Sequence, residues 1–363
     1  MLEQDLISTV IRPEIRALTA YKVADATGYI KLDAMENPYT WPEEIKAEWL
    51  KVIHKAEINR YPDPEARSLC NVLKEYNQLP EQSGILLGNG SDEIIQLLLM
   101  SLPANSTVMA PEPSFVMYKQ IAQCLGLKYQ GLPLLAESFE LDLELTLAAI
   151  KQQQPEIIFI AYPNNPTGNL FDSHAIEQII QHSKGLVIID EAYAPFTDAS
   201  FIAKLSTYNN LLVMRTVSKL GLAGLRLGFI AGQPGIISEL NKARLPYNIN
   251  ILTQCSTEFV LTHPEMFAQQ TEILRNERAR MFLQLSTIHG IRPYPSAANF
   301  ILFRTEQNKA TPIFNALKEQ GILIKNLSPQ QGPLSDCLRV TIGKPEENNA
   351  FIKALKNAKN AMP

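Results

Sequence analysis

The sequence predicts an α/β protein with a large domain built on a mostly parallel sheet, a smaller C-terminal α+β domain and an N-terminal arm. From about residue 41 to 250, short runs rich in Ile, Leu and Val alternate with helical patterns, as they do where helices cover both faces of a parallel sheet. The last hundred residues instead place strands close together beside a long helical pattern, which is typical of an α+β unit. A chain of 363 residues with 46% hydrophobic residues can bury such cores.

The elements of the large domain follow from its apolar runs. Strands are expected at 85–87, 107–110, 157–161, 186–189, 211–215 and 227–231, with helices such as 92–101 and 174–183 between them. Pro246 and the run NIN at 248–250 interrupt this pattern, so we expect the domain boundary within 244–263. The chain is therefore divided into an arm with part of the small domain, a large domain and a small domain, over residues 1–40, 41–255 and 256–363.

The small domain is expected to begin with a long helix over 264–287, whose apolar residues recur at helical spacing. A strand at 299–303, a helix at 312–320, strands at 322–325 and 338–342, and a helix from Pro345 complete it. Ligands of open α/β sheets bind beyond the carboxyl ends of the strands. The residues that follow each strand are therefore the candidates for a site.

Composition and charge exclude several classes of function. Lys and Arg number 33 against 37 Asp and Glu, a formal net charge of −4, and no basic tract offers a footprint for nucleic acid. The longest apolar stretch, around 94–100, is far shorter than the ~18 residues of a membrane span. The start MLEQDLISTVIRPEIR lacks the apolar region of a signal peptide. The four cysteines lie far apart and the five histidines form no ligand pattern, so we expect reduced thiols, a cytoplasmic protein and no metal.

The turn after the first strand of the large domain, GNGSDE at 88–93, opens a helix. Free N–H groups and the helix dipole can bind an anion there. The alternative is a tight turn with Ser91 as the helix N-cap. A dinucleotide site is disfavoured, because Glu93 stands at the third glycine of GxGxxG and the acid about 20 residues on, Glu112, lies between two prolines.

Polar residues also follow the next two strands. The run YPNNPTG at 162–168 fixes the backbone and leaves an Asn side chain projecting, whose amide can hold a phenolate or carboxylate oxygen, although the alternative is a plain turn. Asp190 and Tyr193 follow the strand at 186–189, and an Asp buried there requires a cation. An ATPase is disfavoured because the sequence lacks GxxxxGK[ST].

The strand at 211–215 leads into Thr216, Ser218 and Lys219, and Arg226 follows soon after. Hydroxyls and an arginine suit a phosphate. A partly desolvated lysine can act as a nucleophile and form a Schiff base. The Ser-Lys pair alone carries little information, since most such lysines are solvated.

Together, these residues resemble the fold-type-I pyridoxal-phosphate aminotransferases in order and spacing, over roughly residues 12–360. Four segments narrow the resemblance to the histidinol-phosphate aminotransferases, namely LDAMENPY at 32–39, RYPDP at 60–64, PSFVMY at 113–118 and LRVTIG at 338–343. The resemblance implies pyridoxal 5′-phosphate as the cofactor, an electron sink that the protein must orient and tune.

The resemblance also implies roles for the residues at the strand ends. Lys219 forms the Schiff base and shuttles the proton between the substrate Cα and the cofactor C4′. Asp190 pairs with the pyridine nitrogen, Asn165 and Tyr193 hold O3′, and Phe115 stacks on the ring. The phosphate is expected in a cup made of Gly90, Ser91, Asp92, Thr216, Ser218 and Arg226.

Substrate and subunit contacts are implied as well. Arg339 matches the family's carboxylate-binding arginine, whose fork suits the α-carboxylate of glutamate. Tyr21 and Asn37 are expected near the substrate, and Lys325 stands where a second substrate arginine is common, keeping the charge without the fork. Tyr61 is expected to reach the phosphate from a neighbouring subunit, which implies a homodimer with shared sites.

The implied reaction is transamination between L-histidinol phosphate and 2-oxoglutarate, giving imidazole-acetol phosphate and L-glutamate in histidine biosynthesis. An aromatic amino acid aminotransferase and a threonine-phosphate decarboxylase are alternatives on the same fold, because specificity depends on a few pocket side chains. A non-catalytic ligand-binding domain is disfavoured by the intact Lys219 and by the absence of a fused DNA-binding segment.

Overall fold

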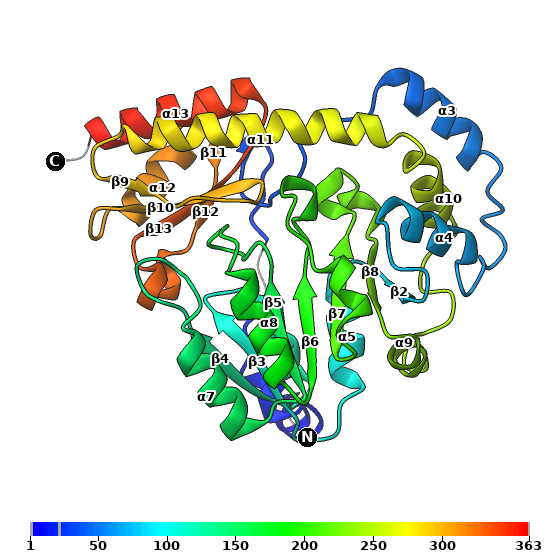
Figure 1. The fold of residues 1–363 in the computed structure, drawn as a ribbon. Coiled ribbons are helices and arrows are strands. Elements are labelled where there is room, and N and C mark those ends of the chain that lie inside the picture. Colours follow the sequence, from blue (N-terminus) through cyan, green and yellow to red (C-terminus); the bar gives the residue numbers. More distant parts are fainter. Residues whose placement is uncertain (1–2, 21–22, 362–363) are drawn as a thin grey trace.

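A seven-stranded sheet lies at the centre of the lower part of the molecule, in the order β2-β8-β7-β6-β5-β3-β4 (Figure 1). Neighbouring strands are parallel except where β8 pairs antiparallel with β2 and β7. The computed structural model describes residues 3–20 and 23–361. The strands of this large sheet are β2 Gly84–Gly88, β3 Thr107–Glu112, β4 Lys128–Pro133, β5 Ile157–Ala161, β6 Leu186–Asp190, β7 Leu211–Thr216 and β8 Gly228–Gly232.

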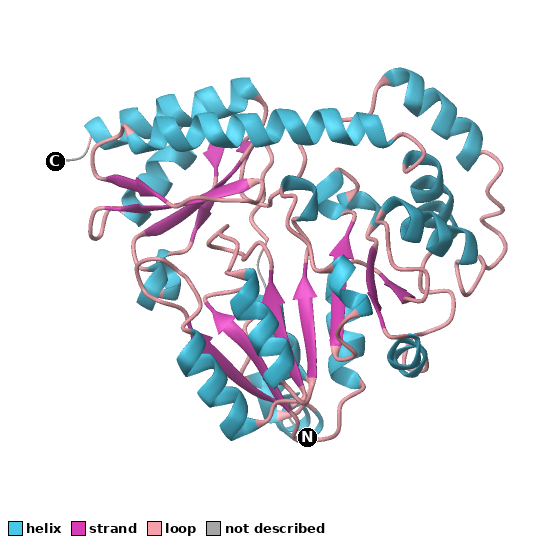
Figure 2. Cartoon of the chain, in the orientation of Figure 1, coloured by secondary structure: helices cyan, strands magenta, loops and turns pink. Residues whose placement is uncertain are grey.

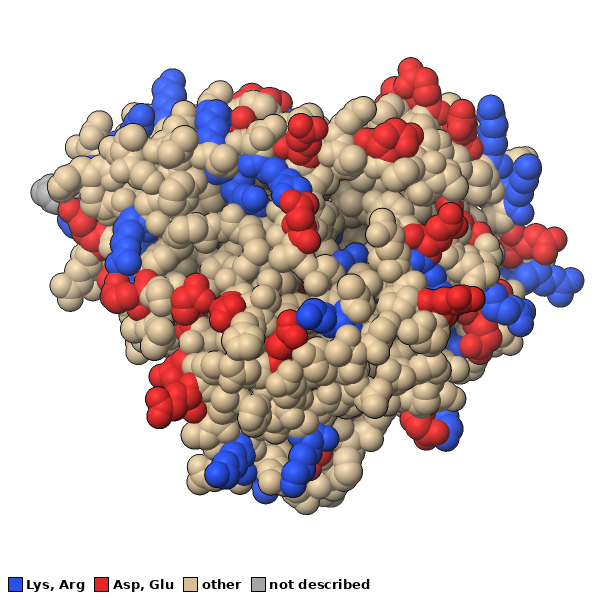
Figure 3. All heavy atoms as spheres, viewed as in Figure 1, with Lys and Arg blue, Asp and Glu red and all other residues tan. Residues whose placement is uncertain are grey.

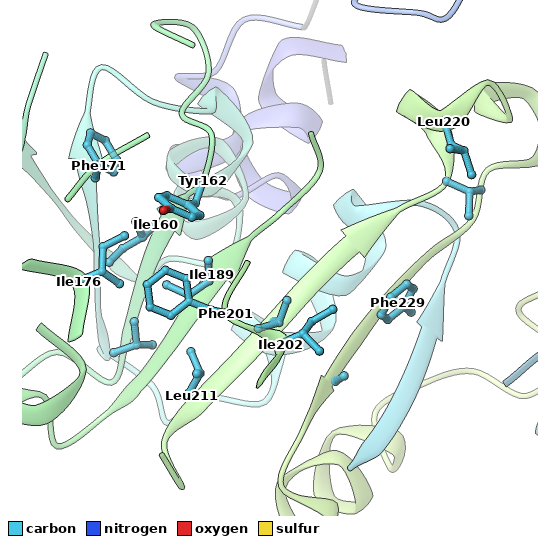
Figure 4. Close-up of a cluster of buried hydrophobic side chains, with 14 of the residues drawn as sticks. Ile160, Tyr162, Phe171, Ile176, Ile189, Phe201, Ile202, Leu211, Leu220 and Phe229 are labelled. Carbon is cyan, nitrogen blue, oxygen red and sulfur yellow. The ribbon is translucent and has the colours of Figure 1, made fainter. Parts of the chain in front are cut away.

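Helices cover both faces of the large sheet, which explains why its central strands are apolar throughout. On β5, Ile157 and Phe159 pack with the helices of one face, whereas Ile158 and Ile160 pack with those of the other. Figure 4 shows part of the apolar cluster to which Ile158 and Ile160 belong, where Ile160, Ile176 and Ile189 lie together. One face carries α5 Ser91–Met100, α6 Val116–Cys124 and α9 Pro234–Asn241, and the other carries α4 Arg67–Tyr76, α7 Leu143–Gln153 and α8 Ser173–His182.

A second, antiparallel sheet lies above the first, in the order β12-β13-β10-β9 (Figure 2). Its apolar core includes Phe300, Phe303 and Phe351, all fully buried. The strands are β9 Ile291–Pro293, β10 Phe300–Thr305, β12 Lys325–Asn326 and β13 Cys337–Thr341. The helices packed around it are α11 Pro264–Ser286, α12 Ala310–Glu319 and α13 Pro345–Asn360.

The N-terminal part of the chain forms a third, two-stranded sheet with the C-terminal part. Strand β1, Ile30–Lys31, pairs in parallel with β11, Ile322–Leu323, and so joins the C-terminal part of the molecule. Helices α1 Glu3–Val10 and α2 Pro13–Arg16 precede it, and α3 Glu43–Ile53 packs against α10 Ile251–Val260. The short 3-10 helices are η1 Ala194–Phe196, η2 Ile202–Ser206, η3 Ser218–Leu220, η4 Ala223–Leu225, η5 Ser328–Gln330 and η6 Gly332–Leu334.

The predicted fold class is confirmed, and the differences concern individual elements. The edge strand β4 was not expected, because Lys128, Tyr129 and Gln130 give it a polar start. The single strand expected at 322–325 is wrong: β11 and β12 belong to different sheets. Ser91 is the first residue of α5 rather than its N-cap, which is Gly90.

The division of the chain into 1–40, 41–255 and 256–363 stays a prediction. Residue 255 lies inside α10, Ile251–Val260, and the first break between helices after it comes before α11 begins at Pro264. Helix α10 packs against α3 and α4, so a division between whole elements would place all of α10 with the large sheet.

The surface carries mixed charge. On the face shown in Figure 3, the Lys and Arg side chains are interspersed with Asp and Glu, and neither sign covers the face. Within residues 3–20 and 23–361, no helix is both long enough and apolar enough to cross a membrane.

Candidate active site

A cavity of about 220 Å³ lies at the carboxyl ends of β5, β6 and β7. These three strands are adjacent and in register, with Ala161 opposite Asp190 and Asp190 opposite Met214. The loops that follow them therefore meet at one edge of the sheet, as the sequence predicts. All of these predicted cofactor residues line the cavity: Gly90, Ser91, Asp92, Phe115, Asn165, Asp190, Tyr193, Thr216, Ser218, Lys219 and Arg226.

Lys219 lies in η3, directly after the loop that leaves β7. Its Nζ donates a hydrogen bond to the main-chain oxygen of Ala34, at 3.2 Å, and lies 6.0 Å from the centre of the Tyr193 ring. Burial, together with the positive charge of Arg339, lowers the pKa of the Lys219 amine to about 8. A substantial share of the amine is therefore neutral and nucleophilic at physiological pH.

Asp190 is the last residue of β6 and is 4% exposed. Its Oδ2 accepts a hydrogen bond from the hydroxyl of Tyr118 at 2.5 Å, and its Oδ1 accepts one from the N–H of Ala192 at 3.0 Å. Burial raises the pKa of Asp190 to about 6, and the two hydrogen bonds oppose that rise. Within the described part of the chain, no salt bridge to Asp190 is present.

Asn165, Tyr193 and Arg339 form a connected polar group beside the lysine. The amide Nδ2 of Asn165 donates to the hydroxyl of Tyr193 at 3.1 Å. Its Oδ1 accepts from Nη1 of Arg339, while Nη2 of Arg339 donates to the main-chain oxygen of Asp33 at 3.1 Å. Arg339 is 7% exposed and lies over the ring of Phe300, 5.2 Å from its centre. Arg339 itself does not line the cavity but contacts Asn165, which does, and its role toward a substrate carboxylate stays a prediction.

Gly90 and Arg226 form the other end of the cavity. Gly90 has φ +78° and ψ 174° and precedes the N-terminus of α5, a conformation that glycine alone adopts readily. A Cβ at this position would lie 2.7 Å from Nη2 of Arg226. The same Nη2 lies 3.8 Å from Oδ2 of Asp92. A guanidinium and the free N–H groups of a helix N-terminus thus face one space, which suits a phosphate.

Two hydroxyls complete that end of the cavity. The Oγ1 of Thr216 donates to the main-chain oxygen of Leu227 and lies 2.9 Å from Oγ of Ser218. The N–H of Ser218 donates to Oγ1 of Thr216 at 3.1 Å. These bonds hold the loop between β7 and Lys219 in a tight turn, with both hydroxyls at the cavity wall.

The residues of the cavity fit pyridoxal 5′-phosphate. The anion at the carboxyl end of β6 is buried, and a protonated pyridine nitrogen would be the cation that its burial calls for. The helix N-terminus, Arg226 and the hydroxyls suit the phosphate, and Phe115 supplies an aromatic wall between them. When bound, the cofactor supplies an aldehyde for an amine and a ring that accepts electrons from the α-carbon.

The remaining predicted residues lie elsewhere. The amide of Asn37 is used within the chain: Nδ2 donates to the main-chain oxygen of Leu220 and to Gln270, and Oδ1 accepts from the N–H of Tyr39. Lys325, on β12, is paired in register with Arg339 on β13. Tyr61 is 80% exposed and stacks on Tyr247. Tyr21 lies outside the described residues. Their roles stay predictions.

Two features of the site were not found from the sequence. One is Tyr118 as the hydrogen-bond partner of Asp190, although it stands three residues after Phe115 in the PSFVMY segment and so on the same side of one helix. The other is the wall formed by Ala34, Met35 and Glu36. Met35 has φ +54°, its N–H donates to Thr341, and its oxygen accepts from Asn299, so this segment is held by residues far away in the chain.

A larger cavity, of about 1080 Å³, lies between α4 and the start of α11 and contains neither Lys219 nor Asp190. Its polar wall includes the ion pair between Arg215 and Glu191, at 2.7 Å. The chemistry of the side chains, rather than the volume, therefore distinguishes the smaller cavity as the candidate active site.

The chain is similar over nearly its whole length to proteins of a known family. The family model for aminotransferase class I and II matches residues 27–355. A histidinol-phosphate aminotransferase of Nitrosococcus oceani is 54% identical over 356 residues, covering 98% of this chain and 99% of the relative. One of Ralstonia nicotianae is 46% identical and covers 96% of this chain and 94% of the relative.

Solved structures show the same fold. The histidinol-phosphate aminotransferase of Clostridium acetobutylicum superposes with a TM-score of 0.84 at 26% identity, over 92% of this chain and 99% of that one. That of Sinorhizobium meliloti, solved with pyridoxal 5′-phosphate, gives 0.86 at 21% identity, over 98% and 99%. The chain belongs to the class I and II aminotransferase family, and to the histidinol-phosphate aminotransferases within it.

Proposed function

We propose that this protein transfers the amino group of L-histidinol phosphate to 2-oxoglutarate with pyridoxal 5′-phosphate as cofactor, giving imidazole-acetol phosphate and L-glutamate in histidine biosynthesis. The observation that carries the proposal is the single cavity that Lys219, Asp190, Tyr193 and Asn165 share, in a chain 54% identical to a histidinol-phosphate aminotransferase. The two half-reactions use the same site, so ping-pong kinetics are expected.

The chain's own residues divide the chemistry. The neutral amine of Lys219 can attack the cofactor aldehyde and later take the proton from the substrate α-carbon. Asp190, buried at the cavity wall, would pair with the pyridine nitrogen and hold the proton there, which would favour electron withdrawal by the ring. Asn165 and Tyr193 would hold the cofactor O3′, and Phe115 would keep water from the ring face.

The acceptor half-reaction needs a site for a carboxylate. Arg339 is buried, and its two terminal nitrogens already contact Asn165 and the oxygen of Asp33. Its planar fork is thereby oriented before substrate enters, which lowers the entropy cost of binding a carboxylate. Lys325, paired in register with Arg339, places a second positive charge nearby for the substrate phosphate.

A homodimer with shared sites is part of the proposal. Tyr61 is 80% exposed, and Ile58 and Leu245, at 76% and 75%, also expose most of their apolar surface. Exposed apolar groups of this kind are typical of surfaces that a second chain covers. The same interface would carry Tyr61 to the phosphate end of the neighbouring cavity.

A panel of amino donors tests the proposed reaction. The purified protein is loaded with cofactor, and kcat/KM with 2-oxoglutarate is measured for histidinol phosphate, phenylalanine, aspartate and threonine phosphate. Histidinol phosphate is expected to give the highest value. Phenylalanine as the preferred donor would identify an aromatic amino acid aminotransferase, and release of carbon dioxide from threonine phosphate would identify a decarboxylase.

A further inference from the structure

The partner of Asp190 on the side away from the cavity is Tyr118, the third residue of α6. Its side chain is fully buried, and its hydroxyl lies 2.5 Å from Oδ2 of Asp190. A carboxylate can only accept hydrogen bonds, so the phenol must be the donor. Burial and the negative charge of Asp190 raise the pKa of Tyr118 well above its usual value, so it keeps its proton.

The ring of Tyr118 is fixed before any ligand binds. It stacks on Phe159 of β5, with centres 4.6 Å apart and planes 7° from parallel, and it meets Phe115 edge-on at 5.5 Å. Phe159 is itself fully buried. The hydroxyl therefore cannot follow Asp190 if that side chain rotates, and each carboxylate oxygen has its own fixed donor, Tyr118 for Oδ2 and Ala192 for Oδ1.

We propose that Tyr118 is a positioning residue, whose hydroxyl holds the Asp190 carboxylate in one orientation and favours its ionised form, so that a charged oxygen faces the pyridine nitrogen of the cofactor. The proposal rests on the function proposed above. Two residues at the start of α6 then act on the cofactor: Phe115, the N-cap, lines the cavity, and Tyr118, three residues later, fixes the Asp190 carboxylate.

Other charges act on Asp190, and the test must hold them constant. Asp92 at the start of α5 and Glu191, the next residue in the chain, disfavour its ionised form. Lys219 and Arg226 face the same cavity from the loop that follows β7. Substituting Tyr118 by Phe changes none of these groups and keeps the ring that stacks on Phe159. Only one donor is removed.

The experiment titrates the full-length apoprotein with pyridoxal 5′-phosphate from pH 5 to 9 and follows binding by absorbance. At pH 7, Tyr118→Phe is expected to bind roughly 10-fold more weakly, the low end of the loss for a hydrogen bond to a charged group. Affinity is expected to fall in two steps as the pH is lowered, near pH 8 as Lys219 is protonated and near pH 6 as Asp190 is protonated. In Tyr118→Phe the lower step, here called the acid limb, is expected to move up by about one pH unit, since loss of the donor disfavours the carboxylate. The cofactor phosphate also titrates near pH 6, but equally for every variant.

Two further variants serve as controls for Tyr118→Phe. Tyr129→Phe is the control, because burial and the nearby negative charge of Glu112 likewise raise the pKa of Tyr129, while neither residue lines the cavity. It should leave the limb in place. Asp190→Asn should abolish the contribution of Asp190 to the limb. Thermal unfolding checks that each variant is folded.

The outcomes separate the two proposals. An unmoved limb in Tyr118→Phe, with the limb altered in Asp190→Asn, would overturn the role of Tyr118 and leave the proposed function intact. A wild-type profile in Asp190→Asn would overturn the pairing of Asp190 with the cofactor, and the role of Tyr118 with it. An equal shift in Tyr129→Phe would also overturn the role of Tyr118. Fluorotyrosine at position 118, a stronger donor, should move the limb down, and this test removes no side chain.

Discussion

Replacing Gly90 by Ala should damage cofactor binding by two separable effects. Gly90 has φ +78° and ψ 174°, a region that costs a residue with a Cβ roughly 1–3 kcal/mol. The new Cβ would also lie 2.7 Å from Nη2 of Arg226, so the guanidinium must move away from the phosphate end of the cavity. A charge-assisted hydrogen bond contributes about 1.5–3 kcal/mol. Because Arg226 is 52% exposed, solvent screening favours the lower end, an affinity loss of about 10-fold.

Two measurements separate these effects. Thermal or denaturant unfolding of the apoprotein reports the backbone strain, and titration of the apoprotein with pyridoxal 5′-phosphate reports the lost phosphate contact. Gly224→Ala is the matched control, because Gly224 belongs to η4, next to Arg226, and its new Cβ would meet nothing within 4 Å. It should change neither quantity appreciably. Wild-type cofactor affinity in Gly90→Ala would refute the assignment of this end of the cavity to the phosphate.

Three further predictions concern the lysine, the substrate cations and the shared site. Because the pKa of Lys219 is lowered to about 8, the rate of cofactor capture by the apoprotein should rise with pH through about 8 and level off above it. A rise centred near 10.5 would contradict the lowered pKa. Lys219→Ala should give no covalent cofactor adduct after reduction with borohydride. Arg339→Lys removes the planar fork of the guanidinium, so kcat/KM for glutamate should fall about 10- to 150-fold. Lys325→Ala should instead reduce kcat/KM for histidinol phosphate more than for glutamate. Equal losses for both donors would show that these residues do not divide the substrates. Refolding Tyr61→Phe together with Lys219→Ala should give heterodimers more active than either parent, because one site then has both residues intact; no gain in confirmed heterodimers would place the site within one chain.

The candidate catalytic residues could be predicted from the sequence because each belongs to a short motif at the end of a strand. Asn165, Asp190 and Lys219 each follow a short apolar run. Hydrogen bonding in register aligns β5, β6 and β7, so the carboxyl ends of these strands meet at one edge. If these runs form neighbouring strands of a parallel sheet, the residues that follow them lie close together, whatever contacts the side chains make.

Elements that depend on distant partners could not be predicted in this way. Lys325 continues an apolar run from Ile322, and only tertiary pairing assigns 322–323 to β1 and 325–326 to β13. The polar start of β4 hides an edge strand, because one side of it pairs with no other strand of its sheet. Period and composition report burial along a segment, but they do not report which segment lies beside it.

The sequence by itself determined the fold class, the family and the strand-end residues that line the cavity. Each of these depends on the order of residues along short stretches of the chain. The tertiary structure alone decided how those residues are held. Tyr118 meets Asp190 across 72 positions, and Arg339 meets Asn165 across 174. Such contacts depend on the packing of α6 and β13 against the sheets. In the folded protein these groups are buried away from water, so each buried donor has to pair with an acceptor that the tertiary structure brings to it.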